Sequence, residues 1–266
     1  MHKRGQIAIF IIVGSIILIS LILLIYFKSE SIKSLLNKQS QETINIPKEL
    51  QVVTNYIDNC LKENSEEAIY QIGRSGGYYQ MQGEYIVFFT ETIPYYYSSS
   101  KENIPKLELI EKGISNFIED FSIDCFNLKD FQKKGFEISQ GEISVSTKIG
   151  IKDINIKIIK PIKIKKNQNE FSIDNFNYVI RSNFMSQYNV GKELVNIYSK
   201  KPGYICLTCL EELPYNNLSI DVLPIADPSV EENDIFWILI DDREFTVNNK
   251  TLTLRFVIEK WKNYSQ

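Results

Sequence analysis

The chain has 266 residues, and 44% of them are apolar, which is enough to fill the core of one large domain or two small ones. Thirty basic residues against 33 acidic ones give a net charge of −3 at pH 7. Proteins that bind nucleic acid usually carry a concentrated basic face, so this balance gives no electrostatic reason to expect a nucleic-acid partner.

The first element is an uncharged apolar run at residues 7–27, which follows a basic segment at residues 1–6. In a helix this run spans roughly 30 Å, the thickness of the hydrocarbon core of a bilayer. A secretory signal peptide has a shorter apolar region and a cleavage site of small residues after it, and YFKSESIK offers no such site. The run therefore predicts a single transmembrane helix in the lipid bilayer.

The charges around this run favour one orientation. Lys3, Arg4 and the terminal amine form a compact positive cluster before the span, whereas the lysines after it are spread out and partly offset by Glu30. By the positive-inside rule, the N-terminus is expected in the cytoplasm and the main domain outside the cell.

The junction Lys3-Arg4-Gly5-Gln6, followed at once by IAIFIIVG, resembles the class III signal peptide of archaeal pilin-like and archaellin-like precursors. The resemblance implies cleavage between Gly5 and Gln6, with the apolar helix retained in the mature protein. Many pilins carry a glutamate at the fifth mature position, where this chain has Phe10. Processing and anchoring are therefore expected more than assembly into filaments. With the CxxC of Cys206 and Cys209, this start also resembles that of uncharacterised archaeal membrane proteins with an α+β exterior, a resemblance that covers most of the chain.

Beyond the span, residues 28–46 are polar with sparse apolar residues and predict a stalk or helical extension. An extracytoplasmic domain is expected over residues 47–266, with a sub-boundary near residue 130. Apolar residues at helical spacing predict one amphipathic helix from Pro47 to Gly73 and a second from about Pro105 to Cys125, with Phe117 and Phe121 on the apolar face of the second.

Between these helices, two short strands joined near Gln82-Gly83 form a hairpin candidate. Residues 93–105, IPYYYSSSKENIP, predict a loop. Its tyrosines, Tyr95, Tyr96 and Tyr97, are a candidate binding loop for carbohydrate or a protein partner, because aromatic side chains on a loop supply contact area at low entropic cost. The alternative is that these rings pack under the loop.

Alternating apolar and polar residues from Phe136 to Ile180 predict three or four antiparallel strands. Within them KIIKPIKIKK, residues 157–166, predicts an exposed strand with one solvated face. A helix is expected from about Met185 to Lys200, and three strand-like runs follow it, SIDVLPI, DIFWILI and KTLTLRFVI. Helices and antiparallel strands in separate blocks predict the α+β class.

The sequence lacks the residues and motifs that several common kinds of catalytic site require. The single histidine is His2, before the predicted span, so the exterior domain has no histidine for a Ser-His-Asp system or a histidine-based zinc site. Phosphate-binding glycine motifs are absent from the sequence, and we expect no cofactor and no metal. The acidic pair Asp241-Asp242 is expected between strands, as ordinary turn residues.

The four cysteines are even in number, as expected for disulfides in an extracytoplasmic domain, and they allow three pairings. Cys60 and Cys125 each fall near the end of an amphipathic helix, so packing of the two helices could bring them into bonding range. Cys206 and Cys209 would then pair with each other or stay free. A CxxC can be a redox couple, half of a metal site or a structural link, and the preceding KKPGY and the following Pro214 favour the structural role.

Asn217, Asn249 and Asn263 begin N-x-[ST] sequons, which suit an exported domain. The sequence thus favours a single-pass membrane-anchored surface protein with a structural, adhesive or pilin-like role, with other envelope or pilus-like proteins as partners and without a catalytic site. Two alternatives remain open: a membrane-tethered thiol-disulfide oxidoreductase that uses Cys206 and Cys209, and an extracytoplasmic ligand-binding domain.

Overall fold

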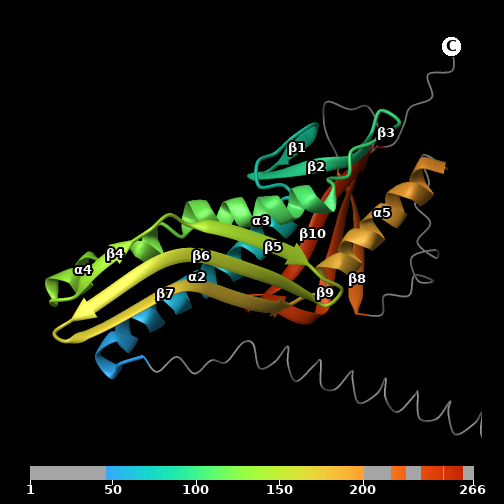
Figure 1. Cartoon of the computed structure of the whole chain (residues 1–266). Helices are drawn as coiled ribbons and strands as arrows, with labels where there is room; N and C mark the ends of the chain where they lie inside the picture. Colours follow the sequence, from blue (N-terminus) through green and yellow to red (C-terminus); the bar gives the residue numbers. More distant parts are fainter. Residues whose placement is uncertain (1–45, 201–216, 226–234, 248, 260–266) are drawn as a thin grey trace, which may run out of the picture. The chain divides into compact units, whose positions relative to one another are not determined.

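The computed structural model describes residues 46–200, 217–225, 235–247 and 249–259 (Figure 1). The chain divides into two units, Met1–Ile46 and Pro47–Gln266, and every described residue except Ile46 belongs to the second unit. The predicted transmembrane helix, nearly all of the stalk, and Gly5 and Gln6 lie outside the described residues. Among the described helices, none is both long and apolar enough to cross a membrane.

The described part of the chain has the α+β architecture that the sequence predicts, with four α-helices and two sheets. The longest helix, α2 (Lys48–Arg74), begins directly after Pro47, as predicted. Just beyond its end lies Gly76, whose φ of 57° is in the left-handed region. A Cβ atom at Gly76 would come within 2.4 Å of Pro94 and 2.5 Å of the Arg255 carbonyl oxygen, so only glycine allows the chain after α2 to approach the sheet so closely.

The larger sheet has six strands, in the order β1-β2-β10-β9-β8, with β3 also paired to β2. Strands β2 and β10 run parallel, and the other neighbouring strands of this sheet are antiparallel. The last three strands correspond to the three strand-like runs of the sequence. The bounds are β1 (Tyr85–Phe88), β2 (Glu91–Ser98), β3 (Lys101–Glu102), β8 (Leu218–Ile225), β9 (Ile235–Val247) and β10 (Lys250–Glu259).

The helix α5 (Phe184–Lys200) covers one face of the larger sheet and occupies the predicted position. A Cβ atom at Gly191 would lie 3.2 Å from the edge of the Phe256 ring in β10, so the backbone of α5 runs close to the sheet. The Phe256 ring in turn stacks on Tyr96 with centroids 4.1 Å apart, and both side chains are fully buried. The side chains between α5 and the larger sheet, including Tyr96 and Phe256, therefore form the core on this face of the sheet.

The smaller sheet is antiparallel, and its central strand β6 pairs with the three other strands. Strand β7 follows one edge of β6, and β4 and β5 share the other edge in succession. The predicted antiparallel strands between Phe136 and Ile180 are therefore confirmed. Their bounds are β4 (Glu137–Gln140), β5 (Ser144–Ile149), β6 (Asp153–Lys166) and β7 (Asn169–Arg181).

Strand β6 confirms the predicted strand with one solvated face, since its isoleucines are mostly buried while Lys157 and Lys163 are exposed. The exception is Lys160, which lies where the pairing with β7 shifts register. Lys160 is buried, its Nζ donates to the Gly141 carbonyl oxygen at 2.8 Å, and it lies 4.4 Å from the Phe126 ring centroid. Burial lowers the pKa of Lys160.

Helix α2 contacts both sheets and also α3 (Leu107–Phe121), the second predicted helix. A 3-10 turn, η1 (Asp124–Phe126), and a short helix, α4 (Lys129–Lys133), follow α3 and lead into the smaller sheet. In Figure 1, α2 can be followed in blue from its start near β7 to the strands of the larger sheet. The two sheets therefore share one long helix.

Three local predictions were wrong. The hairpin is formed by β1 and β2 and turns at residues 89–90, so the bend at Gln82-Gly83 precedes it. The first part of the expected loop at residues 93–105 is strand β2, which continues to Ser98, because Ile93 and the tyrosines after it find partners in the adjacent β10 and the core. Asp241 and Asp242 lie within β9, where Asp242 is buried, and they are not turn residues.

Candidate binding groove and the adjoining disulfide

A groove of about 520 Å³ lies between the second half of α2 and the second half of α3. We call it the α2–α3 groove. Its volume is within the range of small-molecule binding sites. Its lining is Glu67, Gln71, Ile72 and Ser75 from α2 and its end, Tyr78 and Tyr79 from the following segment, and Phe117 and Phe121 from α3.

Three aromatic rings form one wall of the groove. Phe117 and Phe121, one helical turn apart on α3, stack with centroids 4.4 Å apart and planes 25° apart. The ring of Tyr79 meets Phe117 edge-on at 5.9 Å. Phe121 is 53% exposed, so a large aromatic surface faces solvent instead of the core. Such a surface is able to hold an apolar face of a ligand.

The opposite wall is polar. Glu67 accepts a hydrogen bond from Gln71 Nε2 at 2.6 Å and another from Lys250 Nζ at 3.2 Å, so its charge is offset by the ammonium group. The hydroxyl of Tyr78 donates to the Asn103 carbonyl oxygen at 3.1 Å, and burial raises the pKa of this phenol. The groove thus combines an aromatic wall with hydrogen-bonding groups.

A second hollow of about 220 Å³ adjoins the groove at Tyr78 and Tyr79. We call it the amide hollow, because Gln80, Gln82 and Asn116 line it together with Lys112. The Tyr79 hydroxyl donates to Asp120 Oδ2 at 2.5 Å, and this hydrogen bond is the main reason that the pKa of Tyr79 is raised. Tyr79 is therefore held as a ridge between the two hollows.

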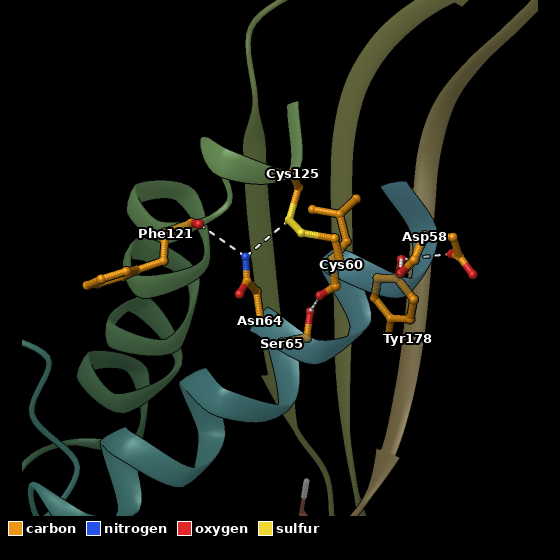
Figure 2. The surroundings of a disulfide bond; sticks show 8 residues. Asp58, Cys60, Asn64, Ser65, Phe121, Cys125 and Tyr178 are labelled. Atoms are coloured by element: carbon orange, nitrogen blue, oxygen red, sulfur yellow. Dashed lines mark hydrogen bonds between the residues drawn. A yellow bond between two sulfur atoms is a disulfide. The ribbon is translucent and has the colours of Figure 1, made fainter. Parts of the chain in front are cut away.

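A disulfide between Cys60 and Cys125 links α2 to η1 beside this groove (Figure 2). The two Cα atoms are 5.6 Å apart, and the bond closes a loop with a sequence separation of 65 residues. Cys60 lies in the middle of α2, away from the helix end where it was expected, while Cys125 lies just beyond α3. The pairing is nevertheless the one that packing of the two helices favoured.

Neighbouring side chains connect the disulfide to the aromatic wall (Figure 2). Asn64 Nδ2 donates to the Phe121 carbonyl oxygen at 3.1 Å and to Cys125 Sγ at 3.2 Å. On the other side of α2, the Tyr178 hydroxyl in β7 donates to Asp58 Oδ1 at 2.8 Å. The segment of α2 around Cys60 is therefore fixed both to the end of α3 and to the smaller sheet.

No protein-family model, curated protein or solved structure matches this chain. The interpretation of the groove therefore depends on its own geometry. Within the described residues, no group of three or more histidine, cysteine, aspartate or glutamate side chains could hold a metal ion.

Among the described residues that the sequence singled out, the structure joins one pair, Cys60 and Cys125. Tyr96 and Tyr97 are buried in β2, and Tyr95 is half-buried and packs against a cluster of buried apolar residues, so these side chains pack within the fold. Asn217 and Asn249 are exposed. Cys206, Cys209 and Asn263 lie outside the described residues.

Sequence reasoning missed the groove. It placed Phe117 and Phe121 on the apolar face of their helix, together with Ile110, Ile114 and Ile118. The three isoleucines are fully buried, but the two phenylalanines lie at the margin of that face and are exposed or half-exposed. The available signal was the width of the apolar face of this helix. The isoleucines alone are enough for packing on one side, so the two phenylalanines at the margin were free to line a surface site.

Proposed function

We propose that this chain is a single-pass membrane-anchored surface protein whose exterior α+β domain has a structural or adhesive role in the cell envelope. The observation that carries the proposal is the Cys60–Cys125 disulfide. Disulfides persist in oxidising compartments and are rare in the cytosol, so a disulfide suggests an extracytoplasmic domain. The uncharged run at residues 7–27 would provide the anchor, and the cluster of Lys3 and Arg4 favours a cytoplasmic N-terminus.

The junction at Gly5 and Gln6 supports processing of the pilin type before a retained helix. An anchored domain of this kind would meet other envelope or pilus-like proteins at the surface. A ligand-binding role for the same domain is favoured by one specific observation, the α2–α3 groove with its exposed aromatic wall.

Labelling of intact cells tests this location. A membrane-impermeant amine reagent is expected to modify Lys157 and Lys163, whose side chains are exposed on the smaller sheet, before the cells are lysed. Mass spectrometry of the same sample is expected to show a mature N-terminus at Gln6 and an intact Cys60–Cys125 linkage. Labelling of these lysines only after lysis would contradict an exterior domain, and an intact Met1 would contradict the processing.

A further inference from the structure

The α2–α3 groove and the amide hollow are neighbouring parts of one surface, because both are lined by Tyr78 and Tyr79. We propose that this surface binds a neutral oligosaccharide, with one sugar ring against Phe117 and Phe121 and the next beyond the Tyr79 ridge. This inference makes the proposed adhesive role more specific. It depends on the proposed exterior location in one respect, namely that the oligosaccharide would come from outside the cell.

The side chains present suit the two chemical faces of a sugar. The C–H face of a sugar ring is apolar and flat, and it matches an exposed aromatic surface such as that of Phe121. Sugar hydroxyls both donate and accept hydrogen bonds. Amide side chains do the same, with an NH₂ group and a carbonyl oxygen on one plane, and three of them line the amide hollow: Gln80, Gln82 and Asn116.

The charges of the site favour a neutral ligand. Recognition of phosphate or carboxylate usually employs arginine or several cations, and Lys112 is the one basic residue among those that line the two hollows in the described structure. Glu67 is offset by Lys250, and Asp120 is engaged by the Tyr79 hydroxyl. A lipid tail fits poorly, because it would leave the amide groups without hydrogen-bond partners.

The site is also held in place before any ligand arrives, which lowers the entropic cost of binding. Gly113 of α3 lies under Tyr79, and a Cβ at this position would be 3.3 Å from the Tyr79 Cβ, tighter than ordinary contact. At the other end, Asn64 holds the carbonyl group of Phe121 and contacts the disulfide. The aromatic wall and the Tyr79 ridge therefore do not need to form during binding.

The test uses the full chain in lipid nanodiscs on an array of neutral and acidic di- to tetrasaccharides, with saturation-transfer NMR on each oligosaccharide that is retained. We expect retention of at least one neutral oligosaccharide. Phe121→Ala and Gln82→Ala, one in each hollow, are expected to weaken its binding by at least about tenfold. Gly113→Ala, which removes no binding group but presses on Tyr79, is expected to weaken binding as well.

Phe89→Ala is the matched control, since Phe89 is 87% exposed and lies outside both hollows on the turn between β1 and β2. It is expected to leave binding unchanged, and a cooperative urea-unfolding transition in each variant shows that the fold is retained. The proposal is overturned if no neutral oligosaccharide is retained, if only acidic ones are, or if Phe121→Ala and Phe89→Ala behave alike. Because the array uses purified protein, such a result is separate from the cell-labelling result that tests the exterior location.

Discussion

Glu119 of α3 accepts a hydrogen bond from the backbone N–H of Val145 in β5, at 2.7 Å. One turn and two turns earlier on the same face of α3, Ser115 is hydrogen-bonded to the Thr147 hydroxyl at 2.9 Å, and Glu111 accepts from the Ile149 N–H at 3.0 Å. In the described sheet, β5 pairs only with β6. The polar stripe of α3 therefore covers the outer edge of β5, which would otherwise be a template for pairing with another chain.

This edge contact predicts a specific loss when the acceptor is removed. Glu119→Leu leaves the Val145 N–H without its acceptor, and we expect the free energy of unfolding to fall by about 1–2 kcal/mol. The uncovered edge is also expected to promote self-association, measured by sedimentation at increasing concentration. Glu119→Gln retains a carbonyl oxygen and is expected to stay close to the wild type in both measurements. Equal behaviour of the two variants would show that the edge is not protected by this residue.

A second prediction concerns Asp242, which is 2% exposed in β9. Its carboxylate accepts from the backbone N–H of Asn183 at 2.8 Å and from the backbone N–H groups of Glu244 and Phe245 at 3.0 and 3.1 Å. Asp242→Ala leaves these groups without that acceptor, and we expect a loss of about 3 kcal/mol or more in urea unfolding. Asp221→Ala, at an exposed position of the neighbouring strand, is the control and is expected to change stability by less than about 0.5 kcal/mol.

Buried Asp242 and exposed Asp221 illustrate which parts of the fold could be predicted from the sequence and which could not. Periodicity placed α2, α3, α5 and most strands, because an element with one buried face repeats its apolar residues at the period of that element. The role of Asp242 could not be predicted, since its partner Asn183 is 59 residues away in the chain. Tyr96 was placed in a loop for the same reason: the residues on either side of it pair with β10, which lies far away in the chain. The groove likewise depends on how α2 and α3 pack, and local pattern does not specify that packing.

A third prediction follows from Tyr178, whose hydroxyl donates to Asp58 Oδ1 at 2.8 Å. Burial, and then this hydrogen bond, raise the pKa of Tyr178 well above its ordinary value near 10. Above about pH 10 the unfolded chain loses this proton while the folded chain keeps it, so the stability that the phenol contributes is present below pH 10 and is lost as pH rises. Tyr178→Phe is expected to lower stability by about 1 kcal/mol at pH 7.

The same variant separates this effect from general alkaline denaturation. Without the phenol, the free energy of unfolding is expected to fall less steeply between about pH 9.5 and 11. The slopes of the wild type and the variant should differ by less than about 1.4 kcal/mol per pH unit, because the side chain is partly exposed. Urea unfolding across this pH range measures the difference between the two slopes. Parallel slopes for the wild type and Tyr178→Phe would contradict the role assigned to this phenol.

A fourth prediction ranks the two sequons that the structure describes. Asn249 is exposed, and its φ of 56° places it in the turn between β9 and β10. Asn217 is also exposed, but its amide nitrogen donates to the Glu244 carboxylate, and it lies directly before β8. If the domain is exported, a glycan is expected at Asn249 in preference to Asn217, because attachment needs an accessible surface turn. Glycopeptide mass spectrometry decides this, and a glycan on Asn217 alone would contradict the ranking.

The last prediction concerns the disulfide itself. Because it closes a loop with a sequence separation of 65 residues, the chain-entropy model assigns it on the order of 4 kcal/mol of stability. The double variant Cys60→Ala/Cys125→Ala is expected to lose a comparable amount in urea unfolding, while reduction of the wild type produces the same shift without any substitution. Since Asn64 contacts both Cys125 and Phe121, the double variant is also expected to loosen the aromatic wall of the groove. A fall in stability without faster hydrogen exchange at the end of α3 would show that the disulfide stabilises the fold but does not hold the groove.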